Sequence, residues 1–118
     1  MMKNFTKNGA QPKRGKYKGI RCDSSWELAF LIYHFDHNLN IKRCEERRKY
    51  VFNGKELNYV PDFITDKGII ELKGCSSPGW RAKLEYNPDI IVYYKKEIQP
   101  YLDYVIGKYG EDFTKLYD

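Results

Sequence analysis

The fold of this chain is decided by residues 59–74, which read YVPDFITDKGIIELKG. The first half, Tyr59 to Ile64, is apolar apart from one aspartate. In the second half, apolar and charged residues alternate over 69–73, as they do in a strand with one buried face. The residues between the two halves are Thr-Asp-Lys-Gly, which favour a tight turn. The stretch therefore predicts a hairpin of two short strands.

The predicted register of this hairpin brings two carboxylates together. With Asp66 and Lys67 at the centre of the turn, Asp62 lies opposite Glu71, with Cβ atoms about 4.5–5.5 Å apart. Like charges so placed destabilise a sheet, and a divalent cation between them removes the repulsion. Mg²⁺ prefers oxygen ligands and keeps several waters that a substrate can replace. Lys73 points the same way, where it could hold a phosphate oxygen or a water nucleophile.

A simpler interpretation of the same residues is an ordinary exposed hairpin with Glu71 and Lys73 on its wet face. Glu-Leu-Lys alone favours that interpretation. Pro-Asp, a tight turn and then Glu-x-Lys, bracketed by apolar residues, favour a site. Pro61 cannot donate to a strand ladder, so it marks an edge or a bulge, and a bulge would shift the register by one residue.

The composition is that of one globular domain. A chain of 118 residues fits a single domain. The sequence has no run of about 18 apolar residues and no signal peptide, so we expect no membrane partner and a cytoplasmic location. Cys22, Cys44 and Cys75 share no metal-type spacing, which favours free thiols in a reducing compartment over a zinc site.

The net charge of +5 is concentrated at the N-terminus. Residues 1–21 carry seven basic residues and no acidic one, whereas the remaining 97 residues have a net charge of −2. We expect residues 1–19 to be a flexible basic arm and residues 20–118 to be the folded domain. An arm of this charge favours binding to a phosphate backbone through counterion release, and the alternative is a solvated tail. The basic residues expected to contact DNA here are Lys13, Arg14, Lys16, Lys18 and Arg21.

Residues 25–37 predict a helix capped by Ser24 and ended by Asn38 in a left-handed conformation. The helix is apolar nearly all round, which is typical of a buried helix. Glu27 in its first turn is the exception. The helix dipole alone can stabilise a glutamate there, but with a metal site expected nearby we favour Glu27 as the third acidic group of that site.

Residues 41–52 predict a charged strand that turns at Asn53-Gly54 and returns toward the Pro-Asp motif. The basic side chains of this strand either extend a DNA-contact surface or pair with neighbouring acids on a solvated edge.

After the hairpin, the pattern predicts a helix over 80–86, a strand over 90–94 and a closing helix over 97–108 with a proline in its first turn. The strand, helix and strand form a right-handed βαβ unit. Arg81 and Lys83 lie near the start of the first of these helices, where they could steady a phosphate or be surface charges.

With these elements in this order, the chain resembles the PD-(D/E)xK nuclease superfamily. The signature of that superfamily is Pro-Asp at the end of one strand and Glu-x-Lys on the next, here Pro61-Asp62 and Glu71-Leu72-Lys73. The chain is most similar to small phage endonucleases, namely junction resolvases of the endonuclease I type and related homing endonucleases. These often carry Arg-Ser before the helix glutamate, whereas this chain has Asp23-Ser24. The resemblance implies an α/β fold (α+β-like) with a restriction-endonuclease-like core, a mixed central sheet flanked by helices.

The resemblance also implies an activity. It makes Glu27, Asp62 and Glu71 ligands of a catalytic Mg²⁺, for which Mn²⁺ can substitute, and Lys73 the residue that activates or orients water. The implied reaction is hydrolysis of phosphodiester bonds in duplex or branched DNA, without a small-molecule cofactor. The implied protein is a phage-encoded homodimer that acts in the cytoplasm of a bacterial host. The alternative is a nucleic-acid-binding module on the same fold that does not cut.

Overall fold

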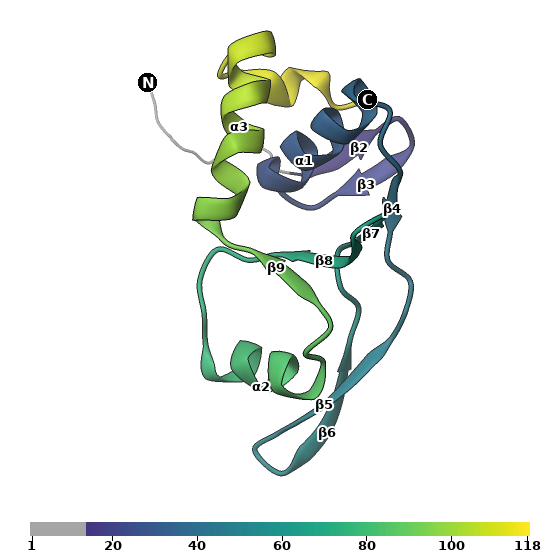
Figure 1. Ribbon diagram of the computed structural model, residues 1–118, viewed down its shortest axis with the longest axis vertical. Coiled ribbons are helices and arrows are strands. Elements are labelled where there is room, and N and C mark those ends of the chain that lie inside the picture. The colour runs from purple at the N-terminus through teal and green to yellow at the C-terminus, as the bar shows by residue number, and fades with distance from the viewer. Residues whose placement is uncertain (1–13) are drawn as a thin grey trace.

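The computed structural model describes residues 14–118 (Figure 1). Most of the predicted arm, including Lys13, lies outside the described residues. The helices are α1 (Ser25–Asp36), α2 (Pro78–Tyr86), α3 (Lys95–Tyr109) and the 3₁₀ helix η1 (Phe113–Leu116). The strands are β2 (Gly15–Tyr17), β3 (Ile20–Cys22), β4 (Ile41–Arg43), β5 (Arg48–Phe52), β6 (Lys55–Tyr59), β7 (Phe63–Thr65), β8 (Gly68–Leu72) and β9 (Ile91–Tyr93).

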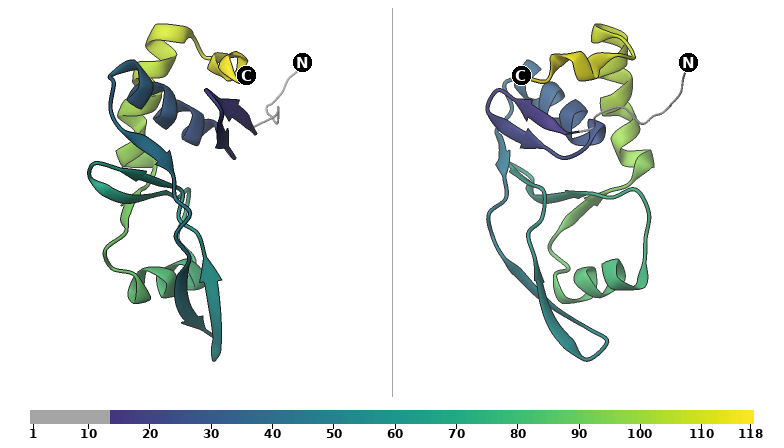
Figure 2. Two further views of the ribbon diagram at one scale, coloured as in Figure 1. Left: turned by 90° about the vertical axis from the view of Figure 1, so that its right-hand side faces the viewer. Right: turned by 180° about the vertical axis from the view of Figure 1, so that it is seen from behind.

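The strands form a central four-stranded sheet of order β4-β7-β8-β9 and two separate two-stranded sheets, β2-β3 and β5-β6. In the central sheet β4, β7 and β8 are antiparallel, whereas β9 lies parallel to β8 after the crossover through α2. The chain is therefore a mixed α and β protein, as predicted. Helices α1 and α3 lie on one side of the central sheet with the β2-β3 hairpin, and the β5-β6 ribbon extends the other way beside α2 (Figures 1 and 2).

Helix α1 begins at the predicted residue and ends close to the predicted one. The Ser24 side chain caps it by accepting a hydrogen bond from the Glu27 backbone N–H at 3.2 Å, and Asn38 takes the left-handed conformation, with φ 56°. The helix has 12 residues and ends at Asp36, one residue before the predicted end. None of the helices in the described part of the chain is long and apolar enough to cross a membrane.

The core lies where α1 packs against α3 and the central sheet. Its buried members from α1 are Leu28, Ala29, Phe30, Leu31 and Ile32. Phe63 and Ile70 reach this core from the hairpin, and Ile98 and Val105 reach it from α3. An apolar helix surrounded in this way needs no polar face, which explains its nearly uniform composition.

The prediction that residues up to 19 form a flexible arm is wrong for residues 15–19. Gly15–Tyr17 pairs with Ile20–Cys22 in an antiparallel hairpin. The Tyr17 ring packs edge-on against Phe35 with centroids 5.8 Å apart, and the Asp118 backbone N–H donates to the Lys16 carbonyl at 2.7 Å. The apolar residues that fix this hairpin are few and stand among lysines, so the charge pattern conceals them.

The prediction of one strand over residues 41–52 is also wrong, because the strand is interrupted at 44–47. β4 pairs with β7 in the central sheet, whereas β5 pairs with β6 in the ribbon. The Arg48 guanidinium binds both carboxylate oxygens of Asp89 at 2.9 Å and fixes the start of the ribbon against the loop after α2. The chain leaves one sheet and enters another at this point.

Helix α2 begins at Pro78, two residues earlier than predicted, with Ser77 as its cap. Helix α3 also begins two residues early, at Lys95. Pro100 therefore lies inside α3, beyond the first turn in which the sequence places it.

Candidate active site

The register of the β7-β8 hairpin is the predicted one, over all three pairs from Phe63↔Ile70 to Thr65↔Gly68. Asp62 directly precedes the first of these pairs, and Glu71 is the next residue of β8. The Asp62 backbone N–H donates to Glu71 Oε1 at 3.2 Å. The two acidic residues therefore meet at the open end of the hairpin, as the sequence predicts.

The backbone on both sides holds Asp62 in place. Pro61 is fully buried directly before it. The Asp62 carbonyl accepts a hydrogen bond from the Cys44 N–H of the neighbouring segment at 3.0 Å, and its Oδ2 accepts one from the Leu72 N–H of β8 at 2.8 Å. The carboxylate is therefore positioned by the sheet itself, independently of flexible side chains.

Ionisation of these two carboxyl groups is unfavourable in the folded protein. Burial, followed by the charge of Glu27, raises the pKa of Asp62 to about 6. Burial, followed by the charge of Asp62, raises the pKa of Glu71 to about 8. Within residues 14–118, no salt bridge reaches either carboxylate. The pair therefore carries negative charge that the described residues leave without an ion-pair partner.

Lys73 follows the last residue of β8 and lies at the same end of the hairpin. Its backbone N–H donates to the Tyr93 carbonyl at 3.0 Å, which continues the pairing with β9. Its Nζ lies over the Trp80 ring, 5.5 Å from the centroid, and its charge lowers the pKa of Glu71. The ammonium is thus half-buried beside the carboxylates, although it forms no salt bridge with them.

Glu27 lies close to this pair but has partners of its own. Its Oε1 accepts hydrogen bonds from Arg43 Nη1 at 2.6 Å and from the Asp23 backbone N–H at 2.9 Å. The Glu27 charge raises the pKa of Asp62, so the two carboxyls are near enough to interact. In the part of the chain that the structure describes, no three His, Cys, Asp or Glu side chains are gathered so as to hold a metal ion. The structure therefore brings Asp62 and Glu71 together and leaves Glu27 bound to an arginine.

Asp62 and Glu71 nevertheless fit a hard divalent cation. Each uses one oxygen to accept one backbone N–H, and Oδ1 of Asp62 and Oε2 of Glu71 accept no hydrogen bond from the part of the chain that the structure describes. Nearby, the Tyr59 hydroxyl is buried and has no hydrogen-bond partner within residues 14–118. Carboxylate oxygens together with replaceable waters are what Mg²⁺ prefers.

The basic residues predicted to contact DNA lie in two places. Arg14, Lys16, Lys18 and Arg21 are exposed on or next to the β2-β3 hairpin, where Lys16 and Arg21 stand directly opposite each other. On α2, Arg81 is exposed. Lys83 is half-buried over the Tyr59 ring, at 4.8 Å, and its charge lowers the pKa of Glu71. Of these two basic residues of α2, Lys83 is therefore the one that interacts with the carboxylates.

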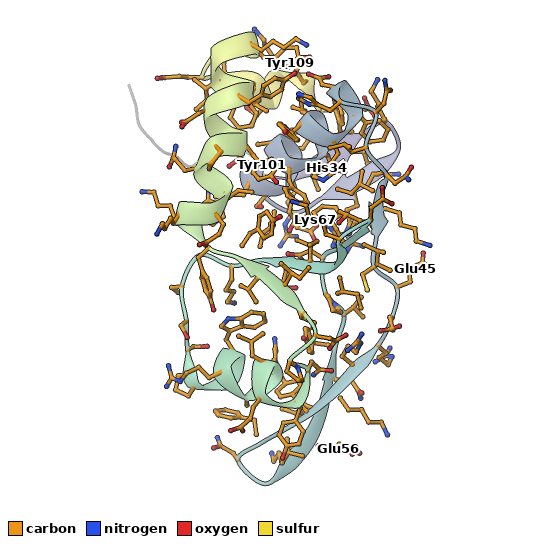
Figure 3. The ribbon with its side chains drawn as sticks, viewed as in Figure 1. His34, Glu45, Glu56, Lys67, Tyr101 and Tyr109 are labelled. Atoms are coloured by element: carbon orange, nitrogen blue, oxygen red, sulfur yellow. The ribbon has the colours of Figure 1, made fainter. Side chains whose placement is uncertain are left out.

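The opposite end of the hairpin is separate from this site. Figure 3 shows Lys67 at the turn, beside His34 of α1 and Tyr101 of α3. These residues line a cavity of about 130 Å³. His34 Nδ1 is bonded to the Phe30 carbonyl at 2.7 Å, as expected for a buried structural histidine.

The chain matches no protein-family model, no curated protein and no solved structure. What the site can do therefore follows from its own residues. Two apposed carboxylates with raised pKa values beside a lysine are suited to holding a cation and a phosphate together.

Sequence reasoning missed the role of Arg43. Arg43 is one of several charged residues in 41–52, and a basic residue in a charged strand gives no sign of its partner. The signal lies 16 residues away, in the buried Glu27 that needs a cation or a donor.

Proposed function

We propose that this protein is a metal-dependent DNA endonuclease that hydrolyses phosphodiester bonds with a site of the PD-(D/E)xK type. The observation that carries the proposal is the pair Asp62 and Glu71. They are half-buried, their pKa values are raised, and no described residue forms a salt bridge with them. A sheet gains nothing from such a pair unless a cation compensates it.

In this proposal Asp62 and Glu71 hold Mg²⁺, with Glu27 as the third ligand. When bound, the metal, or Mn²⁺ in its place, supplies Lewis acidity toward the phosphoryl oxygen and lowers the pKa of a water. Lys73 supplies positive charge where the attacked phosphate becomes more negative, and it orients the water nucleophile. Trp80 holds the ammonium at that position through the cation–π contact.

The DNA strand reaches this site across two basic surfaces. One consists of Arg14, Lys16, Lys18 and Arg21 with Lys13, which precedes the described residues. The other is the start of α2, with Arg81 and Lys83. Opposed basic residues such as Lys16 and Arg21 repel each other in the free hairpin, and a phosphate backbone between them relieves this repulsion.

The finer class of this proposed activity is a phage-encoded enzyme of the junction-resolving or homing type. It acts on branched or duplex DNA, as a homodimer, in the cytoplasm of a bacterial host. Support for this class is the resemblance of the Pro61-Asp62 and Glu71-Leu72-Lys73 motifs and their order along the chain.

The test is cleavage by purified protein of linear duplex, supercoiled plasmid and a four-way junction, each with Mg²⁺, with Mn²⁺ and with chelator. We expect metal-dependent cutting that Glu71→Gln abolishes and Lys73→Met strongly reduces, while both variants retain DNA binding. Glu111→Gln and Lys96→Met are matched controls at exposed positions. Cutting confined to the junction identifies a resolvase, and cutting of plasmid or duplex at discrete positions identifies a site-directed endonuclease.

The second candidate is a nucleic-acid-binding module that does not cut. The observation that favours it is Arg43 bound to Glu27, because an arginine there leaves the described residues without three carboxylates ready for a metal. Salt-sensitive binding without cutting of any of the three substrates would select this candidate.

A further inference from the structure

Arg43 has several partners near the candidate site. Its Nη1 lies 2.6 Å from Glu27 Oε1, and its Nη2 lies 3.6 Å from Asp23 Oδ2. Nη1 also lies 3.4 Å from the Arg21 carbonyl, and the guanidinium stacks over the Phe63 ring at 4.9 Å. The Glu27 and Arg43 side chains are only 9% and 17% exposed. A short charge-assisted bond between two such groups is a strong interaction.

The same guanidinium has hydrogen-bonding capacity left over. Its Nε is buried and has no partner among the described residues. Arginine–carboxylate pairs are frequently bidentate, with two parallel bonds to one carboxylate. Here the fork is divided between two acids, and one donor remains unsatisfied.

Arg43 also borders a groove at the surface, on the side where DNA is proposed to bind. It lines a groove of about 370 Å³ between the β2-β3 hairpin and β4, together with Arg21 and Lys42. Glu45 and Glu46 line the other part of this groove, and Figure 3 shows Glu45 at the outer edge of the molecule. A phosphate that enters beside Arg21 and Lys42 therefore meets Arg43 at the groove wall.

We propose that Arg43 exchanges partners during binding: it holds Glu27 in the free protein and moves to a DNA phosphate when a divalent cation takes over the Glu27 carboxylate. This inference rests on the proposed function, because it assigns Glu27 to the metal. It makes Arg43 a phosphate-binding residue of the site. It also explains why Asp62 and Glu71 lie together, whereas Glu27, the proposed third ligand, is bound to Arg43.

The first test measures metal binding without DNA, by calorimetric titration of Mg²⁺ and of Mn²⁺. In the wild-type protein the cation competes with Arg43 for Glu27. Removing the competitor in Arg43→Met is therefore expected to tighten metal binding about tenfold. Arg47→Met is the matched control, since Arg47 is exposed close by along the chain and forms no salt bridge among the described residues. Its metal affinity is expected to equal that of wild type.

The second test measures DNA binding without metal, in chelator, as a function of salt. Glu27→Gln releases Arg43 and is expected to tighten DNA binding several-fold and to raise the salt slope by about one phosphate contact. The double variant with Arg43→Met separates release of the arginine from the simple loss of a negative charge. If the released guanidinium carries the gain, the gain disappears in the double variant.

The outcomes are distinct. Unchanged metal affinity in Arg43→Met, or a gain from Glu27→Gln that persists in the double variant, overturns the exchange and leaves Arg43 as a structural partner of Glu27. If Arg43→Met does not fold, the salt dependence of Glu27→Gln decides alone, and an unchanged slope refutes the exchange. Wild-type cleavage is measured in parallel: cutting with no effect of Arg43 rejects only this inference, whereas no cutting of any substrate rejects the proposed function.

Discussion

Glu71→Gln should stabilise the metal-free protein at pH 8 and leave its stability nearly unchanged at pH 4.5. Glutamine keeps the size of the side chain and an oxygen that can accept the Asp62 backbone N–H. It lacks the negative charge that burial and Asp62 make unfavourable, as the raised pKa of Glu71 indicates. The substitution therefore removes a cost without removing a contact.

The magnitude follows from the pKa of Glu71, which rises from 4.5 to about 8 on folding. Each pKa unit corresponds to about 1.4 kcal/mol, so the full shift corresponds to about 5 kcal/mol. Part of that cost is repulsion that Asp62 also feels, and solvent screens a half-exposed carboxylate. We therefore expect a gain of about 2 kcal/mol in the free energy of unfolding at pH 8.

The direction with pH follows from linkage. Because the pKa of Glu71 is higher in the folded state, the folded protein binds more protons than the unfolded chain between pH 4.5 and about 8. The contribution of Glu71 to stability is intact below pH 4.5 and is lost as the pH rises through about 8. The benefit of Glu71→Gln should therefore grow across this window.

The assay is urea unfolding of both proteins in chelator at several pH values, with Glu111→Gln as the control at an exposed position. Added Mg²⁺ should then stabilise the wild-type protein at pH 8 by mass action and have a much smaller effect on Glu71→Gln. A loss of stability at pH 8, or an equal gain at pH 4.5 and pH 8, would refute the reasoning. Either result would mean that Glu71 is not held as a strained charge.

Three further predictions concern Lys73, the proposed catalytic lysine, and the packing. Lys73→Met should reduce cleavage by about 10²-fold or more with little change in DNA affinity, measured under single-turnover conditions, because in the proposed mechanism its charge acts on the transition state. Gly15→Ala should destabilise the fold by about 1–3 kcal/mol in urea unfolding, since an added Cβ would lie 2.6 Å from the Tyr117 ring; an unchanged midpoint would mean that the tail moves away freely. Phe63→Ala should cost about 3–5 kcal/mol by leaving a cavity beneath α1, and a cost below 1 kcal/mol would contradict the observed core.

The elements that could be predicted from the sequence are those fixed by neighbouring residues. The β7-β8 hairpin follows from the turn at Asp66 and from alternation, and the start of α1 follows from Ser24, because turns and caps are short-range interactions. The apposition of Asp62 and Glu71 then follows from counting residues back from the turn.

The elements that could not be predicted depend on contacts between distant residues. β5 begins at Arg48, which binds Asp89, 41 residues further along the chain. The β2-β3 hairpin is held in part by the last residue of the chain, Asp118. The partner of Glu27 is Arg43, which reaches it only because β4 lies beside α1 after folding. The sequence alone therefore does not indicate that an arginine separates Glu27 from the other two carboxylates.

Trp80 belongs to a small core that is separate from the main one, and this separation affects which part of the molecule unfolds first. Trp80 is buried, yet it is not among the members of the main core cluster around α1. It packs instead near Tyr59 of the ribbon, with ring centroids 6.5 Å apart, and donates to the Tyr94 hydroxyl at 2.8 Å. The ribbon and α2 therefore share a small core of their own and can exchange amide protons as one cooperative unit, ahead of the rest. Because Lys73 rests on Trp80, each such opening would release the lysine while Asp62 stays within the more protected sheet.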